Sequence, residues 1–177
     1  RQIELTQIKS QIKKINNVVG RLVKFANVNQ KDIKIQPCNI NSILNDYFFL
    51  VKSTLDNANL EYILDFENDL PSILCHPNYI YQLLTNIFSL IKSSKTKKGG
   101  VIIQTRFKDD NVILRVISTN KVDASNKTEN NNVQQNLSVS IIKNLMKKHE
   151  GQFEIGSFEN SGAALVLLFP LKRKIRK

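Results

Sequence analysis

An amphipathic pattern occupies residues 76–94, in the middle of the chain. Its apolar residues recur every three or four positions, which is the period of a helix with one buried face: Ile80, Leu83, Leu84, Ile87, Phe88 and Ile91. Asn86 is an amide that lies directly before Ile87 in this pattern. Lysines gather toward the end of the segment and Gly99 and Gly100 follow, as is typical of a helix C-terminus. The pattern therefore predicts a helix that organises the middle of the fold.

Shorter patterns surround this helix. Alternating apolar residues predict strands, and three- or four-residue spacing predicts two further helices. Asn39 or Asn41 is the expected N-cap of the helix before the central one, and the polar residues 120–136 have the composition of a mobile loop. The predicted order is strand 33–37, helix 39–58, strand 60–66, helix 76–94, strands 101–107 and 112–118 joined by a turn at 108–111, helix 137–146, and strands 152–157 and 163–169. This order predicts an α+β fold, a two-layer sandwich with helices on one face of a mixed sheet.

The N-terminal residues have a different pattern, with apolar residues separated by four, three, four and three positions. Such spacing forms the a/d seam of a coiled coil and needs a partner helix. We therefore predict that this segment mediates dimerisation through an apolar seam made of Ile8, Ile12, Ile15, Val19 and Leu22.

Charge is concentrated at the two ends of the 177-residue chain, which has a formal net charge of +11. Residues 1–37 carry a surplus of six positive charges, residues 172–177 add five, and the region between them is neutral. The sequence has basic ends, but it has no basic face between them, no aromatic strand platform and no zinc-ligand spacing. This combination argues against nucleic acid as a partner. The two cysteines, Cys38 and Cys75, stand alone in sequence and are expected to be reduced, buried thiols. No apolar run is long enough to span a membrane, so the chain is expected to be cytoplasmic, as a separate protein or as part of a membrane-anchored sensor.

Several local sequences resemble the catalytic, ATP-binding domain of sensor histidine kinases, in the superfamily that includes DNA gyrase and MutL-type ATPases. Pro77, Gln82 and Asn86 match the family's central helix, and the first helix resembles the second helix of its dimerisation and phosphotransfer hairpin. The C-terminal third carries the most specific matches, which are residues 140–143 (SIIK), 149–155 (HEGQFEI), 161–164 (SGAA) and 168–170 (LFP). The resemblance implies a hairpin helix at residues 1–30, an ATPase-type domain of the Bergerat kind at 31–171 and a basic tail at 172–177.

The nucleotide-binding positions depart from the family pattern. The Asn that holds magnesium in the family is Leu90 here, and the Asp that binds adenine is Ser118. Family glycines that let the backbone approach the nucleotide are absent from residues 118–122 and 135–139. The sequence therefore predicts no catalytic residue, metal or cofactor, and a vestigial nucleotide pocket formed by Asn86, Leu90, Ser118, Asn120, Asn136 and Ser138.

These departures predict a degenerate histidine kinase, or pseudokinase, in two-component signalling. It would act as a dimeric scaffold or as the body of a histidine phosphotransferase, with a response-regulator receiver domain as partner. The phosphoacceptor is expected upstream of Arg1 rather than at His76 or His149. Two alternatives remain open, a divergent kinase that still binds ATP and magnesium, and a nucleic-acid-binding protein that uses the basic ends.

Overall fold

The computed structural model describes residues 7–9, 12, 35–92, 99–119, 132–157 and 162–172. Among these are three long helices and seven strands. In chain order they are β1 (Gln36–Cys38), α2 (Ile40–Asn57), β2 (Leu60–Asp65), β3 (Ile73–Cys75), α3 (Pro77–Lys92), β4 (Gly99–Lys108), β5 (Asn111–Ser118), α4 (Asn132–Lys148), β6 (Gln152–Ser157) and β7 (Ala163–Pro170).

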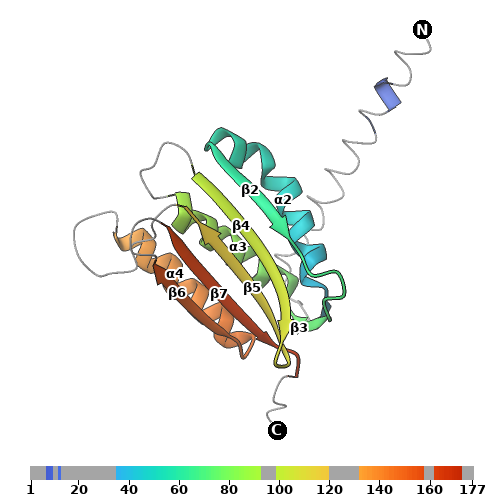
Figure 1. The fold of residues 1–177 in the computed structure, drawn as a ribbon, viewed down its shortest axis with the longest axis vertical. Coiled ribbons are helices and arrows are strands. Elements are labelled where there is room, and N and C mark those ends of the chain that lie inside the picture. Colours follow the sequence, from blue (N-terminus) through green and yellow to red (C-terminus); the bar gives the residue numbers. More distant parts are fainter. Residues whose placement is uncertain are drawn as a thin grey trace.

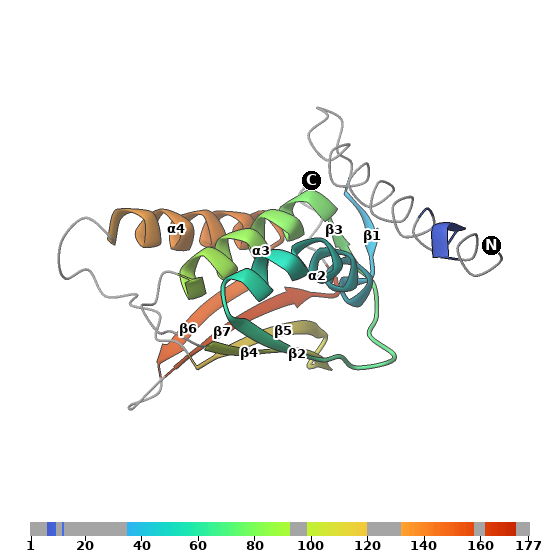
Figure 2. The ribbon, with the colours of Figure 1, turned by 90° about the horizontal axis from the view of Figure 1, so that it is seen from above.

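Five of the strands form one mixed sheet in the order β2-β4-β5-β7-β6. β2 runs parallel to β4, and the other neighbours are antiparallel. Figures 1 and 2 show that α2, α3 and α4 all cover the same face of this sheet. The predicted two-layer α+β sandwich is therefore confirmed.

Aromatic side chains fasten α2 to α3 and to the sheet. Phe48 on α2 stacks on Tyr62 of β2 with ring centroids 4.8 Å apart, and meets Phe88 of α3 edge to face at 5.4 Å. The Tyr47 ring also packs against Phe88, with the centroids 5.9 Å apart. Burial raises the pKa of the Tyr47 phenol to about 12, opposed by a hydrogen bond with Thr85. The helix layer is thus held to the sheet by large rings that fit together in specific orientations.

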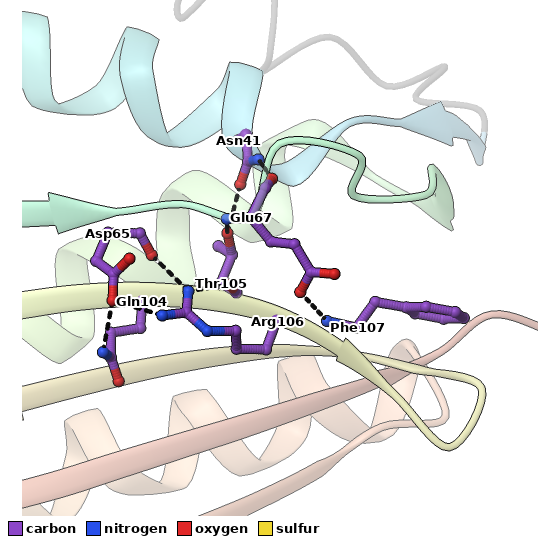
Figure 3. A network of polar contacts seen from close by, with 7 residues as sticks. All are labelled: Asn41, Asp65, Glu67, Gln104, Thr105, Arg106 and Phe107. Atoms are coloured by element: carbon purple, nitrogen blue, oxygen red, sulfur yellow. Dashed lines mark hydrogen bonds and ion pairs between the residues drawn. The ribbon is translucent and has the colours of Figure 1, made fainter.

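A polar network fixes the N-terminal end of α2, close to the point where β2 ends and a loop begins (Figure 3). The hydroxyl of Thr105 on β4 donates to Asn41 Oδ1 at 2.8 Å and accepts from the Glu67 backbone N–H at 3.1 Å. Beside it, Arg106 Nη2 donates to Asp65 Oδ2 at 2.6 Å, and this bond, with one from Gln104, lowers the pKa of the Asp65 carboxyl. The network joins α2, the loop and β4 through groups that would otherwise lose hydrogen bonds to water.

Several predicted boundaries need correction. Strand β3 was not predicted at all, and β1 continues through Pro37 to Cys38 instead of ending at the proline. Helix α4 begins at Asn132, so the last residues of the predicted loop are helical. Asn39, rather than Asn41, caps α2 by accepting a hydrogen bond from the Ser42 N–H.

The prediction of two separate, reduced thiols is wrong, because the structure joins Cys38 and Cys75 in a disulfide. The two strands that carry them, β1 and β3, pair antiparallel in a small two-stranded sheet. This pairing places the two cysteine Cα atoms 6.0 Å apart, within the range that a disulfide can span.

Little of the N-terminal segment is described. Residues 7–9 and 12 are helical, and Ile8 and Ile12 are each 52% exposed. The other members of the apolar seam, Ile15, Val19 and Leu22, lie outside the described residues, so the dimerisation role and the boundary at residue 30 stay predictions. Within the described parts, no helix is both long and apolar enough to cross a membrane.

Candidate nucleotide site

Helix α3 carries two of the predicted site residues one turn apart. Leu90 is buried in the core at 1% exposure, so its side chain is an apolar packing group. Asn86 is half-buried, and its Nδ2 donates to the Gln82 carbonyl of the same helix at 2.8 Å. One N–H of the Asn86 amide is therefore engaged within α3, and the second N–H and the side-chain carbonyl oxygen are the groups it keeps for a ligand.

Ser118 ends strand β5 on the face that packs against the helices. Its neighbours across the sheet are Val101 on β4 and Ala163 on β7, and Ser118 itself is 2% exposed. Gly162 lies against the backbone here, since a Cβ at that residue would come within 2.5 Å of the Ser118 carbonyl oxygen. The position is enclosed, and the side chain that it encloses is a neutral hydroxyl.

The residue after Ser118 has a role that the sequence did not suggest. Thr119 is hydrogen-bonded to Gly100 through its backbone N–H, which donates to the Gly100 carbonyl at 3.0 Å, and through its Oγ1, which accepts from the Gly100 N–H at 2.9 Å and donates to the Gly100 carbonyl at 3.4 Å. These bonds continue the β4–β5 pairing one residue past the strand. The chain is thereby held to the sheet directly after Ser118.

Helix α4 contributes the remaining described positions. Ser138 is 5% exposed, whereas Asn136, about half a turn earlier, is on the exposed side. Asn120 lies outside the described residues. Asn120, Asn136 and Ser138 lie in the stretches where the family has glycines close to the nucleotide. Of these three, only Ser138 is shown to be buried.

The elements that carry these residues meet at one end of the molecule. β5 ends where β4 begins, because the two strands are antiparallel, and Figure 1 shows α3 ending and α4 beginning at this same end. The side chains brought there are amides, hydroxyls and a leucine, all without charge. Among the described residues, no three His, Cys, Asp or Glu side chains come close enough to hold a metal ion together.

Two open hollows lie outside the set of predicted site residues. One, of about 550 Å³, is bordered by α4 and the start of β6 and includes Lys143 and Lys147. The other, of about 570 Å³, includes Asp56, Glu61 and Gly100. Neither hollow contains any of the six residues predicted to form the nucleotide pocket.

The two histidines of the chain flank Tyr79 where α3 begins and α4 ends. The Tyr79 ring lies 4.8 Å from the ring of His76 and 6.0 Å from that of His149. His149 is 2% exposed, and its Nδ1 donates to the Leu145 carbonyl at 2.8 Å. The ring of His149 is therefore buried and bonded to the last turn of α4.

The curated proteins that match this chain in sequence include sensor histidine kinases. No family model matches the chain. Among curated proteins, the sensor histidine kinase ZraS of Escherichia coli O157:H7 is 20% identical over 166 residues, which cover 89% of this chain and 36% of that protein. The histidine kinase AtoS of Escherichia coli K12 is 21% identical over 178 residues, or 94% of this chain and 29% of that protein. The chain thus spans about a third of the length of these relatives.

Solved structures of histidine kinases share the fold. AdeS of Acinetobacter baumannii has a TM-score of 0.65 at 15% identity, with 98% of this chain and 86% of that one covered. Full-length ShkA in complex with AMPPNP has a TM-score of 0.65 at 19% identity, covering 96% and 38%. ThkA in complex with the response regulator TrrA has a TM-score of 0.61 at 13% identity, covering 93% and 49%. The chain therefore has the fold of the catalytic domain of sensor histidine kinases, and sensor histidine kinases are its relatives in sequence.

Proposed function

We propose that this chain is a degenerate histidine-kinase module of two-component signalling that has lost ATP turnover and acts by binding a response-regulator receiver domain. The observation that carries the first half is the burial of Leu90. A leucine with 1% exposure in the core has no oxygen or nitrogen to offer a magnesium ion. Phosphoryl transfer depends almost entirely on positioning and charge stabilisation, so a site without this ligand is poorly equipped for it.

The enclosed position of Ser118 supports the same conclusion. A carboxylate there would accept a hydrogen bond with a full negative charge, whereas a hydroxyl makes a weaker, neutral bond. Loss of a good partner for a buried polar group of a ligand costs about 1–3 kcal/mol. This alone lowers the expected affinity for a magnesium–nucleotide complex by about 5- to 150-fold, and the leucine at position 90 lowers it further.

The solved complex of ThkA with TrrA supports the second half. In that complex, a histidine kinase that shares this fold is bound to a response regulator. A domain that keeps the fold but has lost the nucleotide ligands can still present a protein-binding surface. We expect at least one receiver domain of the source organism to bind this chain with a saturable signal in a fluorescence anisotropy titration. If no receiver domain bound, the proposed role in response-regulator binding would be contradicted.

Calorimetric titration with AMPPNP and magnesium tests the first half. The 177-residue chain should give no saturable heat below about 1 mM ligand, a limit that corresponds to roughly −4 kcal/mol of binding free energy. ShkA, which is solved with AMPPNP, is the positive control. A clear micromolar affinity for this chain would overturn the proposal of a lost ATP site.

A variant that restores both ligands sharpens this test. Leu90→Asn combined with Ser118→Asp returns an amide and a carboxylate to the family positions, and should bind AMPPNP more tightly than the unmodified chain. Ile63→Asn is the control for adding an amide away from the site, because Ile63 on β2 is 63% exposed and is not one of the predicted pocket residues. Circular dichroism must show that each variant is folded, since an amide in the core costs stability.

A further inference from the structure

The disulfide between Cys38 and Cys75 lies where the chain enters the domain. Cys38 ends β1, the short strand before α2, and Cys75 ends β3, directly before α3. The first turn of α3 begins at the residue after Cys75, because the Tyr79 N–H donates to the His76 carbonyl at 2.9 Å. The bond therefore ties the entering segment to the beginning of the helix that carries Asn86 and Leu90.

Apart from the disulfide, the attachment of β1 is slight. Its sheet with β3 has three residue pairs, Gln36 with Cys75, Pro37 with Leu74 and Cys38 with Ile73. Pro37 has no N–H to donate to this pairing. Ile35 and Leu74 are 48% and 42% exposed, so they bury little apolar surface when β1 docks. Figure 2 shows this small sheet beside the helix layer, apart from the five-stranded sheet.

The surroundings of the sulfurs suit both redox forms. Cys38 and Cys75 are 6% and 0% exposed, so either thiol could pack as a small apolar group. Cys38 Sγ lies 3.2 Å from the Gln36 carbonyl oxygen and 3.5 Å from that of Cys75. A reduced Cys38 can donate its S–H to these acceptors, so reduction leaves no polar group stranded in the core.

We propose that Cys38 and Cys75 form a redox clasp, which holds β1 against β3 when oxidised and releases it when reduced. Release of residues 36–38 adds about 10 Å of extended chain before α2. The position of the domain relative to the N-terminal helix then depends on the thiol state of the chain. The clasp goes beyond the proposed function and needs neither nucleotide nor response regulator.

Glutathione supplies the electrons for reduction. Its thiolate attacks one cysteine sulfur, the S–S bond breaks, and the other cysteine leaves as a thiolate that takes up a proton. A second glutathione thiolate attacks the glutathione sulfur of the mixed disulfide, giving glutathione disulfide and the second protein thiol. Two electrons and two protons pass to the protein. Since both sulfurs are buried, each attack requires β1 to open transiently, which three residue pairs allow.

Hydrogen exchange on the intact chain tests the clasp. The protein is equilibrated in buffers of reduced and oxidised glutathione, free thiols are alkylated, and mass spectrometry counts the alkylated cysteines. Amides of residues 36 and 38 should exchange at least about tenfold faster in the reduced protein. Amides of β5 should exchange equally in both forms, because the large sheet does not depend on the bond.

The double variant Cys38→Ser/Cys75→Ser separates the bond from the reagent. It should show the fast exchange of the reduced protein in every buffer. Equal exchange of β1 in the oxidised and reduced wild-type protein would overturn the clasp. So would native protein that glutathione never reduces, or a double variant whose exchange changes with the buffer.

Discussion

At the scale of single residues, Thr105 connects more of the structure than its size suggests. It is fully buried on β4, and its hydroxyl bonds both the Asn41 side chain of α2 and the Glu67 backbone of the loop after β2. The Asn41 amide in turn donates to the Glu67 carbonyl at 2.8 Å. One hydroxyl thus completes a closed set of hydrogen bonds between three segments, which Figure 3 shows together.

Thr105→Val keeps the shape of the side chain but removes this hydroxyl. Because Asn41 Oδ1 and the Glu67 N–H then lose a buried partner, the free energy of unfolding should fall by about 1–3 kcal/mol in urea denaturation. Thr105→Ser is the matched control, since it keeps both hydrogen bonds and loses one methyl group, at about 1 kcal/mol. A serine variant less stable than the valine variant would show that packing, not hydrogen bonding, governs this position.

Among the elements, the β4–β5 hairpin has a tight connection of two residues. Its register closes at Lys108 opposite Asn111, so the predicted four-residue turn contains only two connecting residues, Asp109 and Asp110. Both have positive φ, 51° and 57°, as a type I′ turn requires. Asn-Gly is the preferred pair for this turn because glycine meets no steric penalty at positive φ.

Replacing the two aspartates with this preferred pair, in the variant Asp109→Asn/Asp110→Gly, should therefore stabilise the protein. The free energy of unfolding should rise by about 0.5–1 kcal/mol. This gain is the backbone strain relieved at positive φ minus the larger conformational entropy that glycine loses on folding. Thermal unfolding followed by circular dichroism measures it. Asp110→Val should have the opposite effect, since a β-branched residue is the least tolerant of positive φ. A stable valine variant would argue against the type I′ geometry.

Elements with a long periodic pattern were predictable, and short ones were not. The stripe on α3 and the alternation in β5 fix their structure locally, because successive residues repeat one period. β3 is only three residues long and lies in the short stretch between Pro71 and Pro77, so it is too short to show a period. Its pairing with β1 is what makes it a strand. The first turns of α4 are polar and lack an apolar face, which is why the sequence pattern placed the helix start later.

For the candidate site, the family resemblance supplied positions, and the surroundings of those positions came from the structure. The family resemblance located Leu90 and Ser118, and alternation along β5 is consistent with the buried side of Ser118. The Thr119–Gly100 bonds and the disulfide depend on residues far apart in sequence. Cys38 and Cys75 are separated by 37 positions, and only the β1–β3 register brings them together.

At the scale of the whole molecule, the described N-terminal residues present an apolar surface to solvent. Ile8 and Ile12 are four positions apart in sequence, each is in helical conformation, and each is about half exposed. Complete burial of an isoleucine side chain contributes about 1.5–3 kcal/mol. A second copy of the same helix is the partner that the a/d spacing predicts.

Sedimentation equilibrium should therefore find a monomer–dimer equilibrium for the 177-residue chain, and Ile12→Asp should raise the dimer dissociation constant at least about tenfold. The reason is that an aspartate in the apolar seam would have to be buried without a partner charge. Ile63→Asp is the matched control, because Ile63 on β2 is 63% exposed and outside the seam. If Ile63→Asp weakened the dimer and Ile12→Asp did not, the sheet rather than the N-terminal helix would be the interface.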